Sequence, residues 1–386
     1  MRIFIAVRHA LDPKFYYGSL WSSNFYPALR QLGHEIIESS VDLLPASSFM
    51  QVAVNFTPEQ RKVRQRITEQ IIGELAAAHQ EKPVDLFLSY FYNAHFEPGG
   101  FAQIHKLGVK TVNFFCNSIY QFELVSEIAK KVNFAWHPER AARELYLKAG
   151  ANPVRVQLGA DPQIYRPHPE ISRQAKACFL GQRYADRDRH LAELIAAGVP
   201  VDIYGTGWEK PSQPKAGSLS AYLSVFSDNI KKNGVFKGLQ RTLAQFYYRR
   251  SSRKLDSLFA SRGRGFTDDI SRTFAAYEVI LNFSNVWSDS RPGSKLLAHV
   301  RLRDFEAPMC RTCYLTGYSD EIGEFYHPGK EIDTYRTPGE LVEKAKFYLA
   351  HPREAEKLRE TGYQRALREH TWKERFKLLF QKIGGN

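Results

Sequence analysis

Four polar side chains near residue 300 have types and spacing suited to binding a phosphorylated sugar. Lys295, His299, Arg303 and Glu306 follow one another at steps of four, four and three residues, which places them on one face of an α-helix. Two cations suit the oxygens of a diphosphate, and a carboxylate accepts hydrogen bonds from ribose hydroxyls. The same spacing permits an internal ion pair between Arg303 and Glu306. These residues alone leave both interpretations open.

A helix over 295–309 is needed to align these groups, and the apolar residues around them favour one. The neighbouring apolar stripe consists of Ala298, Leu302, Phe305 and Met309. A helix with this pattern is expected to be packed on most sides, with only the sector of Arg301 and Asp304 facing water. Before it, Pro292 and Gly293 permit a tight turn. Ser294 is then expected to cap the helix, so that Gly293, Ser294 and Lys295 present N–H groups and a cation to a diphosphate.

A series of short segments extends from this stretch to the end of the chain. They are Phe305-Glu306-Ala-Pro-Met-Cys310, Tyr314-Leu-Thr316, Phe325-Tyr-His-Pro-Gly-Lys-Glu-Ile332, Tyr335-Arg-Thr-Pro-Gly-Glu-Leu341, Tyr348-Leu-Ala-His-Pro352 and His370-Thr-Trp372. In these segments the chain resembles the CgeB-like group of glycosyltransferases, closely over about 270–376 and more loosely from residue 1. The resemblance implies an α/β protein of the GT-B fold, with two Rossmann-like, doubly wound domains facing each other across a cleft.

The resemblance also implies roles and shows departures. Glu306 corresponds to the carboxylate that binds the ribose. Related retaining enzymes carry a second Glu where this chain has Ala298, and a Gly after Cys310 where this chain has Arg311. The lost Gly is the reason to keep a non-catalytic binding protein as an alternative.

The domain organisation follows from strands that alternate with helices, which predicts parallel sheets. Residues 1–165 are expected to form the acceptor-side domain, starting with a strand at 2–7. Residues 166–370 are expected to bind the nucleotide-sugar and to carry a basic insertion at about 209–262. The helix within 371–386 crosses back to the first domain if the chain follows its relatives.

Two strand ends in the second domain are rich in glycine. Gly181 precedes a helix whose N-terminus suits a phosphate, and Arg183 would add a cation. Gly205, Gly207 and Trp208 end the next strand, where glycine would allow close approach of the nucleotide.

Asp186 and Asp188 spell the Asp-x-Asp sequence that holds a divalent metal in other glycosyltransferases. At a helix start, carboxylates are expected instead to cap free N–H groups. We therefore predict no metal and no other cofactor.

Aromatic and amide side chains occur in the loops that follow the strands of the first domain. His9, Tyr92, Asn117 and Tyr120 are expected to line the acceptor wall, because sugars stack on rings and bond to amides. His95 is the candidate general base, with His9 as the alternative. Ordinary aromatic packing under long loops is the competing interpretation.

The net charge of +13 is concentrated in one segment. Residues 230–264 hold ten Lys or Arg and a single acid, Asp256. This segment favours contact with an anionic membrane surface; a solvated basic face or a contact between subunits would give the same composition. No recognised nucleic-acid-binding motif accompanies the charge, so nucleic acid is not expected as a partner.

Two further features of composition indicate a cytoplasmic protein. The four cysteines are scattered, and Cys310 and Cys313 are expected to pack in the core. No run reaches the roughly 18 apolar residues of a membrane span. If the basic segment binds lipid, the protein is expected to be peripheral on the inner face of the membrane.

Together these features predict a metal-independent glycosyltransferase that moves a hexose or related sugar from a nucleoside diphosphate to a hydroxyl. The acceptor would be a sugar, a lipid-linked or a protein acceptor, in bacterial surface polysaccharide or glycoconjugate synthesis. Arg303 would stabilise the leaving diphosphate, and either His95 or the donor's own phosphate would take the proton. A nucleotide-sugar hydrolase or epimerase of the same fold, or a non-catalytic nucleotide-sugar-binding protein, is the alternative.

Overall fold

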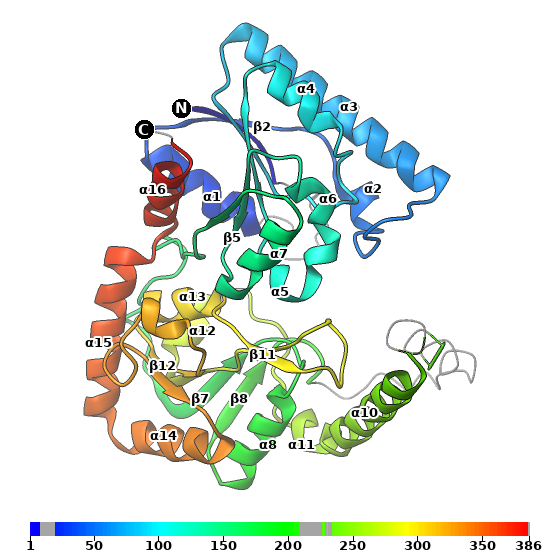
Figure 1. Ribbon diagram of the computed structural model, residues 1–386. Coiled ribbons are helices and arrows are strands. Elements are labelled where there is room, and N and C mark those ends of the chain that lie inside the picture. Colours follow the sequence, from blue (N-terminus) through cyan, green and yellow to red (C-terminus); the bar gives the residue numbers. More distant parts are fainter. Residues whose placement is uncertain (8–19, 209–225, 228–229, 231–233, 385–386) are drawn as a thin grey trace. The chain divides into compact units, whose positions relative to one another are not determined.

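The computed structural model of the chain describes residues 1–7, 20–208, 226–227, 230 and 234–384. These residues form two compact units, each with a parallel β-sheet between layers of helices (Figure 1). Unit 1 comprises Met1–Asp161 together with His370–Asn386, and unit 2 comprises Pro162–Glu369.

The sheet of unit 1 has six parallel strands in the order β2-β1-β3-β4-β5-β6. The strands are β1 (Arg2–Ala6), β2 (Glu35–Glu38), β3 (Leu86–Ser89), β4 (Lys110–Phe114), β5 (Phe134–His137) and β6 (Pro153–Arg155). The order reverses between β1 and β3, so the sheet is doubly wound and its switch point lies there.

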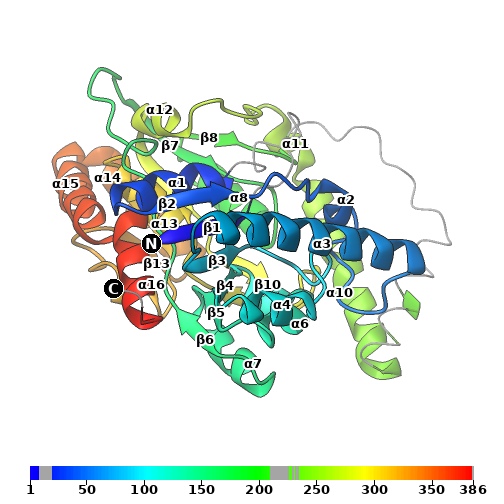
Figure 2. The same cartoon turned by 90° about the horizontal axis from the view of Figure 1, so that it is seen from above.

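Helices pack on both faces of this sheet. They are α1 (Leu20–Gln31), α2 (Leu44–Ser47), α3 (Pro58–Glu81), α4 (Gly100–Lys106), α5 (Ser118–Gln121), α6 (Ser126–Ala129), α7 (Arg143–Lys148) and α16 (Trp372–Lys382). Helices α1 and α16 lie side by side on one face, as Figures 1 and 2 show, and α4 packs on the other. The ring centroids of Phe25 and Trp372 are 4.9 Å apart, and those of Phe25 and Trp136 are 5.6 Å apart. The C-terminal helix therefore completes the core of unit 1.

The main sheet of unit 2 has five parallel strands in the order β13-β12-β9-β7-β8. The strands are β7 (Gln174–Leu180), β8 (Val201–Tyr204), β9 (Tyr277–Asn282), β12 (Cys313–Gly317) and β13 (Asp333–Tyr335). Two further strands, β10 (Asn285–Trp287) and β11 (Leu296–Ala298), form a separate antiparallel hairpin. The order of the main sheet reverses between β7 and β9, which is its switch point.

The helices of unit 2 are α8 (Arg187–Ala196), α10 (Val235–Lys254), α11 (Asp256–Ala260), α12 (Ile270–Ala275), α13 (Arg303–Met309), α14 (Pro338–Ala350) and α15 (Pro352–Glu369). Helices α8 and α14 cover the face that carries Phe179 and Leu281, while α12 and α13 lie on the opposite face (Figure 1). All residues of β9, and all but the last of β12, are at least largely buried, as a parallel sheet covered on both faces requires. Cys310 and Cys313 are buried in this unit, as predicted.

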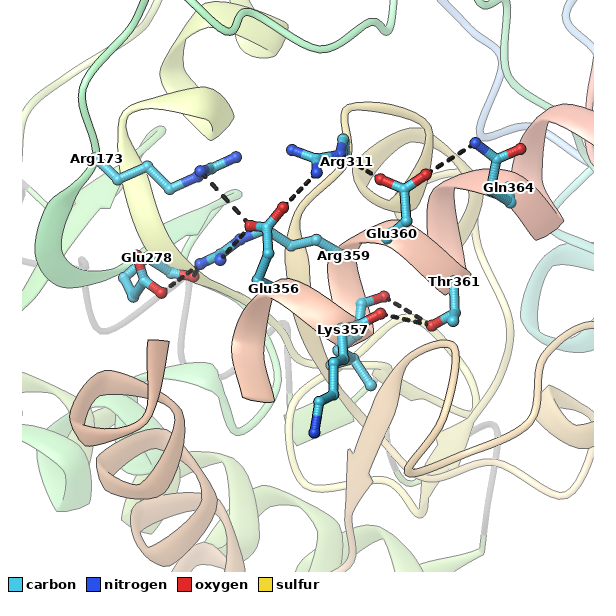
Figure 3. A network of polar contacts seen from close by, with 10 residues as sticks. Arg173, Glu278, Arg311, Glu356, Lys357, Arg359, Glu360, Thr361 and Gln364 are labelled. Atoms are coloured by element: carbon cyan, nitrogen blue, oxygen red, sulfur yellow. Dashed lines mark hydrogen bonds and ion pairs between the residues drawn. The ribbon is translucent and has the colours of Figure 1, made fainter. Parts of the chain in front are cut away.

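A network of charged side chains fixes α13 and α15 to the sheet (Figure 3). Arg359 is 2% exposed and pairs with Glu278 of β9 at 2.5 Å and with Glu356 at 3.0 Å. Arg311 directly follows the C-cap of α13, has a φ of +57°, and pairs with Glu360 at 2.8 Å and also with Glu356. A left-handed backbone favours Gly. Arg311 adopts this backbone and is held by its ion pairs to α15.

Candidate functional site

The predicted helix over 295–309 is wrong in its first half. Residues Leu296–Ala298 form β11, which pairs with β10 in a hairpin, and α13 begins only at Arg303. Lys295 is exposed before β11, and His299 is buried in the loop after it. The four polar groups therefore do not share one helical face.

The hairpin follows from the turn residues between its strands. Ser290 and Gly293 have φ of +62° and +80°, the left-handed backbone of tight turns. The backbone N–H of Ser288 donates to the carbonyl of Lys295 across 2.8 Å. A Cβ at Gly293 would lie 2.9 Å from Ala244, so the glycine is needed for packing against α10. Gly293, Ser294 and Lys295 thus belong to a hairpin end, and the predicted phosphate site at a helix start is corrected.

Helix α13 contains the internal pair that the spacing also permitted. Arg303 Nη1 donates to Glu306 Oε2 across 2.8 Å, and Glu306 is 5% exposed. The guanidinium lies 5.1 Å from the centre of the Phe274 ring on α12. The carboxylate of Glu306 is therefore buried and already engaged by Arg303. The ribose contact of Glu306 and the diphosphate contact of Arg303 stay predictions, and the geometry favours the internal pair.

Asp304, predicted to face water, is instead 1% exposed and accepts hydrogen bonds from several elements. Its carboxylate accepts from the Arg301 N–H at 2.7 Å, the Tyr314 hydroxyl at 2.9 Å and the Thr316 hydroxyl at 3.0 Å. Burial raises the pKa of Asp304, while these donors oppose the rise. The carboxylate fixes the start of α13 to β12 and so positions the loop that carries Arg301.

The switch point of unit 2 is bordered by residues 181–186 after β7 and 283–284 after β9. Ligands of doubly wound sheets bind beyond the carboxyl ends of strands at such a point. Asn285 Nδ2 donates to Asp186 Oδ2 across 2.6 Å, and the Trp287 N–H donates to the Tyr184 hydroxyl across 3.1 Å. These bonds fix the hairpin strand β10 to the loop that leads into α8.

Cationic groups gather at the start of α8. Arg187, its first residue, donates from Nη1 to the Gln182 carbonyl across 2.9 Å. Burial and the charge of nearby Arg301 lower the pKa of Arg187 to about 10. His299 is 3% exposed, and burial with the charges of Arg301 and Arg187 places its pKa well below the ordinary value. Like charges crowded at a helix N-terminus form a place that an anion would stabilise.

The glycines near this point have structural causes. A Cβ at Gly205, where φ is +116°, would lie 2.5 Å from the carbonyl oxygen of Gly181, and one at Gly207 would lie 3.0 Å from Arg183 Cβ. The Trp208 indole N–H donates to the Gly181 carbonyl at 2.7 Å from within the core. The close approach that requires these glycines is between the ends of β7 and β8. Their predicted approach to a nucleotide is therefore not needed to explain them.

Arg183 is bound to neighbouring helices. Its Nη1 donates to Asp256 at 2.7 Å, and its Nη2 donates to the Ser252 carbonyl. The side chain is only 14% exposed. The predicted role of Arg183 as a phosphate cation is corrected to a structural one, because its donors are directed into α10 and α11.

The two aspartates at the start of α8 do not cap the helix as predicted. No side-chain capping bond forms at the N-cap residue Asp186, whose Oδ2 instead accepts from Asn285. Asp188 is 1% exposed and accepts from the Ser252 hydroxyl at 2.6 Å. In the described part of the chain, no group of three or more His, Cys, Asp or Glu residues is arranged to hold a metal ion.

A pocket of about 180 Å³ lies at the carboxyl ends of β9, β12 and β13. It is lined by His190, Phe283, Ser284, Asn285, Gly317, Tyr318, Tyr335 and Arg336. The Arg336 guanidinium lies 3.3 Å from the centre of the Tyr318 ring, and Tyr335 donates to the Asn282 carbonyl at 2.8 Å. Pockets that bury whole drug-sized ligands are about 300–1,000 Å³, so this one has room for part of a nucleotide-sugar.

Among the described residues, the cluster next to the switch point of unit 1 is aromatic and uncharged. Tyr92 is 7% exposed, and its hydroxyl lies 3.4 Å from that of Tyr90. Burial, with a smaller contribution from Cys116, raises the pKa of Tyr92 to about 12. Asn117 and Tyr120 are partly exposed beyond β4. The predicted acceptor wall thus includes a packed hydroxyl cluster, while His9 lies outside the described residues.

His95 does not have the environment of a general base. It is 0% exposed, and Nδ1 accepts from the Tyr92 backbone N–H at 3.1 Å. Its Nε2 lies 3.0 Å from the Ser47 hydroxyl. Since Nδ1 accepts, the network assigns the proton of the neutral ring to Nε2. The prediction of His95 as catalytic base is corrected: both nitrogens are engaged inside unit 1.

Comparison with protein families decides the wider assignment. A family described as glycosyl transferase-like matches residues 187–381, just over half of the chain. The chain belongs to this glycosyl transferase-like family. The predicted glycosyltransferase function is thereby confirmed at the level of the family. A comparison with curated proteins found no match.

Solved structures similar to this glycosyltransferase span its whole length. Anabaena HepE in complex with UDP has a TM-score of 0.57 at 10% identity, covering 100% of this chain and 99% of that one. A glycosyltransferase from Rickettsia africae has a TM-score of 0.59 at 11% identity, with coverages of 99% and 97%. Sucrose-phosphate synthase from Thermosynechococcus elongatus has a TM-score of 0.58 at 13% identity, with coverages of 100% and 99%. These similarities confirm the predicted GT-B fold of two Rossmann-like domains.

Three residues of this glycosyltransferase were not identified from sequence as parts of the site. Arg187 and Arg301 are cations near the switch point, and Asp304 fixes the loop that carries Arg301. The position of Arg187 at the first turn of a helix after a glycine loop is a signal that sequence could have given. None of the described helices is both long enough and apolar enough to cross a membrane.

Proposed function

We propose that this glycosyltransferase binds the nucleoside diphosphate of its donor at the carboxyl edge of the unit 2 sheet. The observation that carries the proposal is the gathering of Arg187, Arg301 and His299 around the start of α8. A diphosphate placed there would relieve the repulsion between the cations and accept N–H groups of the helix.

The nucleotide would extend from the phosphate site toward the pocket beyond β9, β12 and β13. Ser284 and Asn285 line the pocket. Asn285 is the first residue of β10, and its side chain donates a hydrogen bond to Asp186 in the loop before α8. Tyr318 and Arg336 offer a ring and a planar cation, and His190 and Ser284 offer polar atoms. Such groups suit the base and ribose of a nucleotide. UDP is the first nucleotide to test, because Anabaena HepE was solved in complex with UDP.

Two arginines in place of a metal ion would neutralise the leaving diphosphate during transfer of a hexose or related sugar. This supports the proposal of a metal-independent reaction. The acceptor hydroxyl would belong to a bacterial sugar, lipid-linked or protein acceptor and would meet the neutral wall that contains Tyr92. With both nitrogens of His95 engaged, we assign the proton of the acceptor to a phosphate oxygen of the donor. We also propose that the chain is a member of the CgeB-like group, and the resemblance of its segments over about 270–376 supports this.

The test compares two arginines that lie two residues apart in the first turn of α8. Arg187→Gln should weaken UDP binding about 10- to 100-fold, since a hydrogen bond to a charged group contributes about 1.5–3 kcal/mol. Arg189→Gln is the matched control, because Arg189 is exposed on the same turn. Isothermal titration gives both dissociation constants. Equal UDP affinity in wild type and Arg187→Gln would place the phosphate elsewhere.

Activity separates transfer from the alternatives. Thermal-shift screening with UDP-, GDP-, dTDP- and CMP-sugars identifies the donor, and a turnover assay with and without acceptor follows. Acceptor-dependent turnover supports the transferase. Rapid donor conversion without acceptor indicates a hydrolase or epimerase, and binding without turnover indicates a binding protein.

A further inference from the structure

Among the described residues, helix α10 contacts the rest of unit 2 through one stripe of side chains. Arg241 Nη2 lies 2.6 Å from a carboxylate oxygen of Asp289. The ring centroids of Tyr248 and Trp287 are 5.3 Å apart, and the Ser252 hydroxyl donates to Asp188. These three helical positions are spaced by seven and four residues, so they lie on the same side of the helix. That side rests on the β10–β11 hairpin and on the first turn of α8.

The opposite side of α10 is apolar and exposed. The exposed fractions are 72% for Val235, 81% for Phe236, 47% for Leu239, 48% for Leu243, 50% for Phe246 and 66% for Tyr247. At about 100° per residue these six positions fall within an arc of roughly 120°, away from the packed stripe. Among the described residues, nearly half of the large apolar side chains that are well exposed lie on this single helix. A patch of this kind marks an interaction surface.

The charge of the helix specifies the partner. Val235–Lys254 contains six cations and no acid, and only Arg241 among the cations has a carboxylate partner in the described residues. Arg250, Arg253 and Lys254 lie on the same arc as the apolar residues, at its C-terminal end. Long cationic side chains extend to lipid phosphates while the apolar face of their helix reaches the boundary between headgroups and acyl chains.

We propose that α10 is a peripheral anchor that inserts its outer face into an anionic bilayer. A second copy of the chain fits poorly, because two such faces would bring unpaired cations together. Nucleic acid fits poorly, because it would leave the exposed apolar residues uncovered. The proposal does not depend on the donor site, and its test does not involve activity.

The experiment measures flotation of the full chain with vesicles of phosphatidylcholine, with or without phosphatidylglycerol. Wild type should bind only the vesicles with phosphatidylglycerol, and salt should weaken binding. Phe236→Ser/Leu243→Ser/Phe246→Ser should reduce the partition coefficient more than 100-fold, because each substitution removes an apolar side chain that would enter the bilayer. Arg250→Gln/Arg253→Gln/Lys254→Gln should reduce it about 100-fold, since each cation near an anionic surface contributes roughly fivefold.

The matched control is Lys62→Gln/Arg66→Gln/Lys106→Gln, which removes three exposed cations from α3 and α4. It should bind the anionic vesicles as wild type does. Circular dichroism and urea unfolding verify that each variant is folded. The proposal is overturned if wild type ignores anionic vesicles, if the control loses binding as far as the α10 variants do, or if the serine variant still binds. Concentration-dependent dimerisation without vesicle binding, abolished by the serine variant, would assign the face to a second copy instead.

Discussion

The two sheets share one topology but have opposite chemistry at their carboxyl edges. In unit 1 the described residues at the switch point are neutral and buried, as in the cluster of Tyr90, Tyr92 and Cys116. In unit 2 the same position carries Arg187 and Arg301. Under the proposed function, the winding of the strands sets the position of the ligand site, and the side chains suit each edge to a different part of the reaction. A neutral edge suits an uncharged hydroxyl, and a cationic edge suits a diphosphate.

The largest effect is expected where unit 2 depends on a buried charge. Asp304→Ala leaves the donors of Arg301, Tyr314 and Thr316 without their acceptor, which should lower the free energy of unfolding by about 4 kcal/mol. Urea denaturation measures the loss, and hydrogen exchange of peptides from β9 and β12 locates it in unit 2. The exposed Asp320→Ala is the control. Equal stability of the two variants would show that buried charge does not support this edge.

An acid-dependent effect of intermediate size is expected in unit 1. Burial lowers the pKa of His137 from 6.5 to about 4. Below pH 6.5 the imidazole of His137 binds a proton in the unfolded chain but stays neutral in the folded unit. The free energy of unfolding therefore falls as pH falls from 6.5 toward 4. The slope should be about 1.4 kcal/mol per pH unit, with a total of about 3 kcal/mol.

Urea unfolding between pH 7 and pH 4.5 checks this slope. His137→Gln should flatten it, while His105→Gln, an exposed histidine of the same unit, should leave it unchanged. If both variants keep the wild-type slope of unfolding free energy against pH, carboxylates rather than His137 account for the acid sensitivity.

The smallest effect is expected at the neutral edge. Tyr92→Phe removes a hydroxyl that lies 3.4 Å from the Tyr90 hydroxyl, and it should lower stability by at most about 1 kcal/mol. UDP affinity should stay that of wild type, while the KM for the acceptor rises a few fold. Titration calorimetry and steady-state kinetics give the two values. A fall in UDP affinity as large as that of Arg187→Gln would remove the contrast between the two edges.

Much of the fold follows from local sequence signals. The start of α3 is fixed by the capping box of Thr57 and Gln60, a signal that is contained within four residues of sequence. The alternation of strands and helices predicted two parallel sheets correctly. These signals are readable because caps and periodicity act over a few residues.

The β10–β11 hairpin shows where the sequence misleads. Leu296 and Leu297 fit a helical stripe as well as a strand, and the turn at Ser290 and Gly293 decides between them. The partner strand at Asn285–Trp287 supplies pairing that periodicity within 295–309 does not contain. Tertiary pairing overrides the local pattern here.

The site residues show the same limit. Arg183 and Arg187 are both near a helix start, and only the contacts of α10 and α11 distinguish them, since Asp256 engages Arg183. His95 has the type of a base, yet its burial and its contact with Ser47 depend on α2, distant in sequence. Residue type predicted candidates, and long-range packing selected among them.

The placement of α16 has a consequence for biosynthesis. Phe25 and Trp136 lie near the beginning and middle of the chain, but Trp372 and Phe376 complete their cluster. During synthesis on the ribosome, the core of unit 1 cannot be completed until nearly the whole polypeptide has emerged. Unit 2, whose last helix ends at Glu369, can close earlier. A stop codon shortly before residue 372 should therefore harm the first-made half of the enzyme more than the half made last.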